Sequence, residues 1–257
     1  MRFGRKRKHF CMKIFKRLLL GLLIVAVVGS LAFLFWAETP ARPTDIALQA
    51  LSSDSQVTVT QQNGFITFEP ATQQTTTGFI FYPGGRVDYR AYAPVLRKIA
   101  EQGYFVTLMK VRLNLAFFDV NAADRVITAY PQIAHWAIGG HSLGGVAAAI
   151  YTKNHLDTIR AIAFWASYPA DDSLKNSDIL VMSIYGTKDG LSTGGKIEES
   201  KALLPAHTQY VSIDGGNHGQ FGSYGFQAGD NAAVILPEQQ WDQIAAAMVH
   251  LLASLLK

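Results

Sequence analysis

A serine flanked by glycines is the first candidate for chemistry in this chain of 257 residues. Ser142 lies in Gly-Gly-His-Ser-Leu-Gly-Gly, between an apolar run that ends at Gly139 and a helix-forming segment that starts at Leu143. Glycines two positions before and after a serine permit the close backbone contacts of a strained strand-to-helix turn, which exposes a nucleophile. The alternative is a glycine-rich turn in which Ser142 only caps the helix. The context favours a nucleophilic hydroxyl.

Two later polar loops supply a candidate acid and a candidate base. Asp189 follows the apolar run Ile179–Tyr185, and His218 follows the run Gln209–Ile213. A serine hydroxyl is a weak nucleophile at neutral pH, so His218 would take its proton, and Asp189 would orient and stabilise the imidazolium. Each residue alone has another interpretation, because Asp-Gly is a common turn pair and a loop histidine can bond to the backbone. The order Ser142, Asp189, His218 and the three strand ends together favour a catalytic triad.

Acyl transfer also needs two N–H donors for the oxyanion that develops on the substrate. One donor is expected from the residue after the nucleophile, and the other from the loop Tyr82-Pro83-Gly84-Gly85-Arg86 after the first parallel strand. We predict the donors to be Leu143 and Gly85, with Arg86 as the alternative to Gly85. Simple loop glycines are the other interpretation. His141 adjoins the nucleophile, and we expect its side chain to point elsewhere.

These loops require a scaffold that gathers them at one edge. The expected strands are Val57–Thr60, Phe65–Glu69, Gly78–Tyr82, Phe105–Met109, Trp136–Gly139, Ile159–Trp165, Ile179–Tyr185 and Gln209–Ile213, and the expected helices are Tyr89–Glu101, Ala122–Tyr130, Leu143–Asn154, Gly195–Leu204 and Pro237–Leu256. Asn63-Gly64 predicts a tight hairpin between the first two strands. Apolar strands that alternate with helices are typical of a mainly parallel sheet with helices on both faces. The fold class is therefore α/β, with ligands expected at the carboxyl ends of the strands.

The basic charge of the chain gathers at its N-terminus. Residues 1–17 carry eight basic and no acidic residues, which leaves 15 basic against 19 acidic residues in the remainder. This distribution argues against a nucleic-acid-binding protein, which would carry a basic patch on its folded domain. A single cysteine, Cys11, excludes a disulfide framework and a cysteine-rich metal site.

The segment Leu18–Ala37 contains no charged residue. As a helix it covers about 30 Å, the thickness of the hydrocarbon core of a bilayer. We predict an uncleaved, single-pass signal-anchor in the cell membrane, with the N-terminus in the cytoplasm and the catalytic domain outside. Cleavage would instead give a secreted protein. Cys11 is either acylated beside the membrane or a free thiol.

The domain organisation follows from these segments. We predict a basic cytoplasmic tail at residues 1–17, a transmembrane helix at 18–37, a linker at 38–55 and one α/β domain at 56–257. Only Ser167–Asp178 separate the strand after the nucleophile helix from the strand before the acid, so no cap domain fits there. An open site suits small esters, a chain end, or an acyl group at the membrane surface. Arg112–Phe118 either lines an acyl pocket or packs in the core.

The motifs together resemble the α/β-hydrolase superfamily, and more narrowly its small bacterial members. The residues that carry the resemblance are Phe81-Tyr82-Pro83-Gly84-Gly85, Gly139-Gly140-His141-Ser142-Leu143-Gly144-Gly145, Tyr185-Gly186-Thr187-Lys188-Asp189-Gly190 and Gly215-Gly216-Asn217-His218. The resemblance implies this fold and the triad, with no cofactor or metal, from about Gly78 to the C-terminus. It supplies no substrate. The family's frequent His-Gly at the oxyanion loop is Pro83-Gly84 here.

The sequence therefore predicts a membrane-anchored serine hydrolase of bacterial origin. It would cleave a carboxylic ester, small or lipid-like, through an acyl-enzyme at Ser142, without an obligate protein partner. The absence of an Asn-x-Ser/Thr sequon fits a bacterial source. Two alternatives stay open: an acyltransferase that uses the same triad, and a catalytically silent binding protein on the same fold.

Overall fold

The computed structural model describes residues 3–62 and 64–256, with side chains from residue 15 onward. It divides between Thr39 and Pro40 into two compact units. In the first unit, helix α1 extends over Phe3–Ala37, and its part Phe15–Ala37 has 23 residues with a mean hydropathy of 2.8. By length and composition this helix could cross a membrane or serve as a signal sequence. Residues 1 and 2 of the predicted basic tail lie outside the described residues, and the side chains of residues 3–14, including that of Cys11, are not described.

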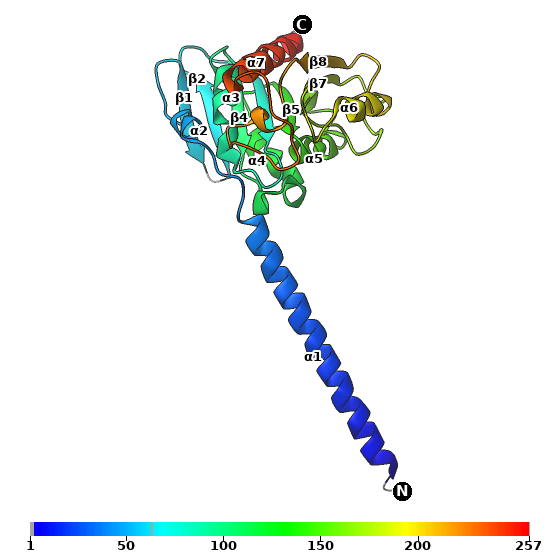
Figure 1. Cartoon of the computed structure of the whole chain (residues 1–257). Helices are drawn as coiled ribbons and strands as arrows, with labels where there is room; N and C mark the ends of the chain where they lie inside the picture. The colour runs from blue at the N-terminus through cyan, green and yellow to red at the C-terminus, as the bar shows by residue number, and fades with distance from the viewer. Residues whose placement is uncertain (1–2, 63, 257) are drawn as a thin grey trace. The chain divides into compact units, whose positions relative to one another are not determined.

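In the second unit, the described residues form one eight-stranded sheet in the order β1-β2-β4-β3-β5-β6-β7-β8 (Figure 1). The strands are β1 Val57–Gln62, β2 Phe65–Pro70, β3 Thr77–Tyr82, β4 Phe105–Met109, β5 His135–His141, β6 Ile159–Trp165, β7 Leu180–Gly186 and β8 Gln209–Ile213. β2 pairs antiparallel with both β1 and β4, and all other neighbours pair parallel. This sheet confirms the predicted α/β class with an antiparallel N-terminal hairpin. Gly64 in the hairpin turn has a φ of +103°, which favours glycine, and Asn63 lies outside the described residues.

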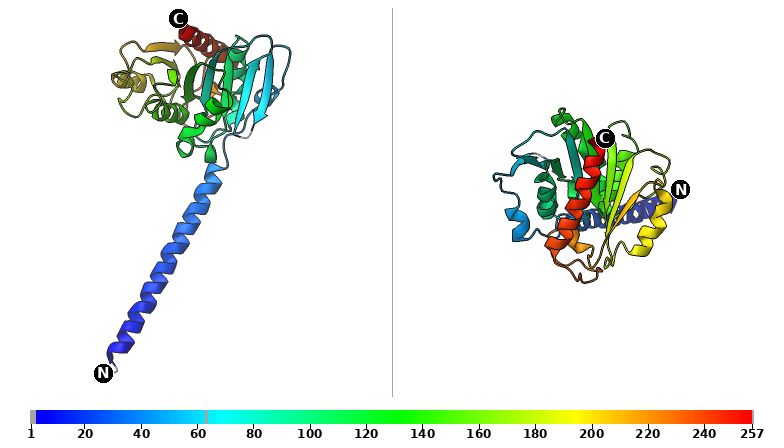
Figure 2. Two further views of the ribbon diagram at one scale, coloured as in Figure 1. Left: turned by 180° about the vertical axis from the view of Figure 1, so that it is seen from behind. Right: turned by 90° about the horizontal axis from the view of Figure 1, so that it is seen from above.

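Helices cover both faces of the sheet. Those of the second unit are α2 Asp45–Gln49, α3 Ala93–Ala100, α4 Ala123–Ala129, α5 Leu143–Thr152, α6 Gly194–Ser200 and α7 Pro237–Ala253. Successive side chains of a strand point to opposite faces. In β3, Phe79 and Phe81 join the apolar layer of α3 and α7, whereas Ile80 and Tyr82 join the layer of α4 and α5. Figure 2 shows α7, coloured red, lying against the strands.

The parallel pairing brings three loops to the carboxyl edge of the sheet. The ends of β5 and β6 are in register at His141 and Trp165, and the ends of β7 and β8 are in register at Gly186 and Ile213. The loops after β5, β7 and β8 therefore open on the same edge, where α/β sheets bind ligands. The connection from β6 to β7 is residues 166–179, all of them described, and it contains no helix or strand. The expectation of no cap domain is confirmed.

Part of the segment predicted as a linker is held by the folded unit. Ala41 forms a β-bridge with Val87, and its amide donates to the Arg86 carbonyl at 2.8 Å. The Thr44 amide donates to the Ser223 carbonyl at 2.8 Å, and their hydroxyls lie 2.6 Å apart. Prolines and small polar residues are typical of tethers, but here Ala41 and Thr44 form hydrogen bonds to distant loops. The folded unit thus starts at Pro40.

Candidate active site

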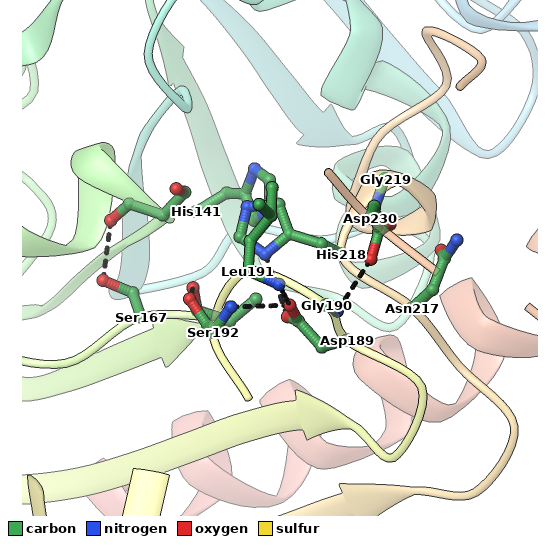
Figure 3. Close-up of polar contacts among 12 residues, drawn as sticks. His141, Ser167, Asp189, Gly190, Leu191, Ser192, Asn217, His218, Gly219 and Asp230 are labelled. Carbon is green, nitrogen blue, oxygen red and sulfur yellow. Dashed lines mark hydrogen bonds and ion pairs between the residues drawn. The ribbon is translucent and has the colours of Figure 1, made fainter. Parts of the chain in front are cut away.

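Ser142 occupies a sharp turn between β5 and α5. Its backbone has φ 51° and ψ −122°, a left-handed conformation that costs energy in a residue other than glycine. The turn is held from outside, because the Ser142 amide donates to the Trp165 carbonyl at 3.0 Å. In addition, the Ser167 hydroxyl, labelled in Figure 3, donates to the Ser142 carbonyl at 2.6 Å. The Ser142 hydroxyl makes no capping hydrogen bond to α5. The backbone thus makes the sharp strand-to-helix turn in which a nucleophile elbow holds its residue, and the Ser142 side chain does not cap α5.

The flanking glycines permit this turn for a steric reason. A Cβ on Gly140 would lie 2.4 Å from the carbonyl carbon of Gly144. A Cβ on Gly144 would lie 2.3 Å from the carbonyl oxygen of Tyr82. Both contacts are with backbone atoms, which no side-chain rotation can relieve, so the two positions require glycine.

Asp189 and His218 form a buried hydrogen-bonded pair. The His218 Nδ1 lies 2.9 Å from the Asp189 Oδ2, and neither side chain is more than 1% exposed. The other carboxylate oxygen accepts the amides of Leu191 and Ser192 at 2.8 and 2.6 Å (Figure 3). A carboxylate in this setting accepts a hydrogen bond from Nδ1–H, and the lone pair of the neutral imidazole is then on Nε2. This Nε2 is buried and has no hydrogen-bond partner within the described residues.

His141 lies beside this pair, contrary to the expectation that it points elsewhere. Its ring centroid is 4.4 Å from that of His218. The reason is the alternation along β5, which puts His141 on the same face as Ala137, in the layer that contains Phe221. Burial, and then the neighbouring His218, lower the pKa of His141 well below its usual value of 6.5, so the His141 ring is neutral at neutral pH.

A buried tyrosine links the loop after β3 to the end of β5. Tyr92, at the end of the short 3-10 helix Tyr89–Tyr92, accepts the Gly84 amide at 3.0 Å and lies 2.8 Å from the His141 Nδ1. Either Tyr92 or the His141 Nδ1 donates in this second bond, according to the tautomer of the neutral imidazole. Burial raises the pKa of Tyr92, so the hydroxyl stays protonated. One hydroxyl thus joins two loops of the site.

The predicted oxyanion donors lie next to each other. A Cβ on Gly85 would be 2.6 Å from Leu143 Cδ1, so the loop after β3 faces the start of α5. Within the described residues, neither the Leu143 nor the Gly85 amide donates to a protein acceptor. The Arg86 amide donates to the Asn114 carbonyl at 2.8 Å, and the Gly84 amide is taken by Tyr92. The geometry therefore favours Gly85 over Arg86 as the second donor.

The structure places the side chains of the predicted acid Asp189 and the predicted base His218 in contact. The predicted nucleophile Ser142 directly follows His141, whose ring lies against that of His218. No hydrogen bond joins the Ser142 hydroxyl to His218 in the part of the chain that the structure describes. In enzymes without substrate such contacts are often long and tighten only when substrate binds. Nor do the described residues contain a group of three or more His, Cys, Asp or Glu side chains able to hold a metal ion.

A comparison with protein-family models matches residues 78–242 to the alpha/beta hydrolase family. The chain belongs to this family. The match includes all three predicted triad positions of this α/β hydrolase and both predicted oxyanion donors. A search of curated proteins gave no match.

Solved structures of other α/β hydrolases share the fold. The chain is 15% identical to a dienelactone hydrolase from Anabaena variabilis, with a TM-score of 0.58. The match covers 76% of this chain and 98% of the dienelactone hydrolase. The esterase domain of a Rhodothermus marinus protein also gives 15% identity and a TM-score of 0.58, over 76% and 97%. Est1E from Butyrivibrio proteoclasticus gives 12% identity and a TM-score of 0.57, over 77% and 100%. At such low identities these likenesses establish the fold.

Proposed function

We propose that this α/β hydrolase is a serine hydrolase that cleaves carboxylic esters through an acyl-enzyme on Ser142. The observation that carries the proposal is the buried Asp189–His218 pair. The His218 Nε2 has no hydrogen-bond partner within the described residues, and the His218 ring contacts His141, the residue before Ser142. Family membership supports hydrolase activity. The strained Ser142 turn supports the choice of nucleophile.

The proposed reaction has two steps. Ser142 Oγ attacks the carbonyl carbon of the ester while its proton moves to His218 Nε2, and Asp189 stabilises the imidazolium through Nδ1–H. The Leu143 and Gly85 amides donate to the oxyanion. The carbon–oxygen bond to the leaving alcohol then breaks, and the alkoxide takes the proton from His218. A water molecule then gives a proton to His218 and attacks the carbonyl carbon of the acyl-enzyme. The bond from this carbon to Ser142 Oγ breaks, His218 returns the proton to Oγ, and the carboxylic acid leaves.

We propose a small or lipid-like ester as the substrate, and a membrane as the location of the enzyme. The connection of residues 166–179 contains no helix or strand that could form a cap over the site, which supports an open site. The apolar segment Phe15–Ala37, preceded by basic residues, supports a single-pass anchor with its N-terminus in the cytoplasm. Intact mass of the protein from the membrane fraction tests the anchor: retention of Met1 supports it, and a start near Glu38 contradicts it.

A chain-length series of 4-nitrophenyl esters tests the reaction. Full-length protein in detergent is mixed with excess ester, and nitrophenolate release is followed over the first turnovers. The expected result is hydrolysis with a burst equal to the enzyme concentration, because the acyl-enzyme accumulates. Ser142→Ala should abolish both phases while the variant keeps the circular dichroism of the parent. Hydrolysis that survives Ser142→Ala contradicts the proposed nucleophile.

A further inference from the structure

A short segment after the base loop touches both halves of the acid–base pair. Asp230 Oδ1 accepts the amide of Gly190 at 3.0 Å, and Oδ2 accepts the amide of Gly219 at 2.8 Å. Gly190 is the residue after Asp189, and Gly219 is the residue after His218. In Figure 3 the Asp230 side chain lies between the two loops. One carboxylate therefore binds the acid loop with one oxygen and the base loop with the other.

The neighbours of Asp230 complete this junction. A Cβ on Gly190 would lie 2.7 Å from the Gly229 carbonyl oxygen, so the acid loop packs directly on the backbone of the segment. On the other side, the Asn217 side chain donates to the Asn231 carbonyl at 2.7 Å. The segment Gly229–Asn231 therefore contacts the residue after Asp189 and the residues on both sides of His218.

We infer that Asp230 is a positioning residue, which fixes the acid loop and the base loop relative to each other for the reaction at Ser142. The inference rests on the proposed function. Before Asp189 and His218, the two loops are joined at the strand ends, where the Lys188 amide donates to the Gly216 carbonyl at 2.8 Å. The Asp189 and His218 side chains are joined by one hydrogen bond of 2.9 Å. The two bonds to the Asp230 carboxylate join the loops again just after these residues, so the acid–base pair is held from both sides. Bonds from amides to an ionised carboxylate are also stronger than bonds between neutral groups.

The chemistry of the carboxylate matters, because both of its oxygens accept. In Asp230→Asn the side chain keeps its shape, but one acceptor oxygen becomes an NH2 donor that faces a backbone amide. The asparagine variant should therefore behave almost like Asp230→Ala. A side chain that only filled space would be replaced by asparagine without loss, so this pair of variants separates the two roles.

The experiment measures both variants in the full-length protein. We expect kcat for the 4-nitrophenyl ester to fall about 10- to 100-fold with KM changed less than about twofold, because a misplaced base affects the transition state more than substrate binding. The low-field proton NMR signal of His218 Nδ1–H should broaden or shift. Hydrogen exchange of the Gly190 and Gly219 amides should accelerate, while exchange in the strands of the sheet stays unchanged.

Asp54 provides a matched control at a distance from the site. Its Oδ1 also accepts two backbone amides, from Gln56 and Val57 at 2.8 and 3.0 Å, at the start of the hairpin. An asparagine at position 54 could keep both bonds, because they go to one oxygen, so the control is Asp54→Ala. This variant removes both bonds and should leave kcat and the His218 signal unchanged.

Two results would overturn the inference. One is a folded Asp230→Asn protein with the kcat and the His218 signal of the parent. The other is a loss of activity that only follows the unfolded fraction in the Asp230 and Asp54 variants alike. If the parent protein hydrolyses no ester, the proposed function fails, but the NMR signal and amide exchange still test whether Asp230 positions the pair.

Discussion

Replacing Tyr92 by phenylalanine removes one hydroxyl that joins two loops of the candidate site. The hydroxyl accepts the Gly84 amide at 3.0 Å and lies 2.8 Å from the His141 Nδ1. Tyr92 is fully buried, and His141 is 1% exposed. Water cannot replace the lost oxygen without a rearrangement, so the variant leaves two buried polar groups, the Gly84 amide and the His141 Nδ1, without this partner.

The magnitude follows from these two orphaned groups. A buried polar group that loses its partner costs about 1–3 kcal/mol. The variant no longer has to bury a hydroxyl, which offsets part of the sum, so we expect the free energy of unfolding to fall by about 2–4 kcal/mol. Gly84 precedes the predicted donor Gly85. A displaced donor should slow the acylation of Ser142 by at least about 10-fold. This loss is smaller than the roughly 10²–10³-fold loss of rate when a donor is removed completely.

Tyr82 provides the matched comparison. It is also fully buried, and its hydroxyl donates to the Val120 carbonyl at 2.6 Å and accepts the Ala123 amide at 2.9 Å. Urea denaturation should give similar losses of stability for Tyr82→Phe and Tyr92→Phe. Rates of labelling by a fluorophosphonate, measured where each variant is fully folded, should fall more for Tyr92→Phe. A stability change below about 0.5 kcal/mol in Tyr92→Phe would refute the reasoning from buried partners.

Two further predictions concern the same turn. Since the pKa of His141 is lowered in the fold, the unfolded chain binds a proton below about pH 6.5 that the folded chain does not, and stability should fall by about 1.4 kcal/mol per pH unit below that value. Urea denaturation at about pH 7.5 and about pH 5.5 should therefore show a larger loss of stability at the lower pH in the parent protein than in His141→Asn. An equal loss in the two proteins would contradict the lowered pKa of His141. A Cβ at position 144 would meet two backbone oxygens, at 2.3 and 2.4 Å, so Gly144→Ala should reduce labelling by more than about 100-fold. Gly194→Ala has no atom within 4 Å of the new Cβ and should label like the parent.

Local patterns were sufficient to predict the sheet and the positions of its loops. Apolar–polar alternation around Asn63-Gly64 marked the first two strands, and short apolar runs marked the later six. The glycines around Ser142 indicated close backbone contacts that the structure contains. The strand predicted as Trp136–Gly139 extends to His141 in the structure, and this extension fixes the direction of the His141 side chain. The contacts of Asp189 with His218 followed from two strand ends that neighbour each other in the sheet.

Contacts between distant segments could not be predicted in this way. Tyr92 and His141 lie 49 positions apart, and Gly190 and Asp230 lie 40 apart. Neither pair belongs to a local motif, since each depends on how loops meet after the sheet has formed. For the same reason, the sequence does not predict the contact of Thr44 with Ser223, because the composition of residues 40–55 is typical of a linker.

Covalent trapping tests the central claim, an activated serine at position 142, most directly. Full-length protein is treated with a fluorophosphonate, digested, and analysed by mass spectrometry beside Ser142→Ala and His218→Ala. The account predicts one adduct per chain on Ser142, absent from the first variant and strongly reduced in the second. A folded parent protein that stays unlabelled, or an adduct that persists in Ser142→Ala, would contradict it.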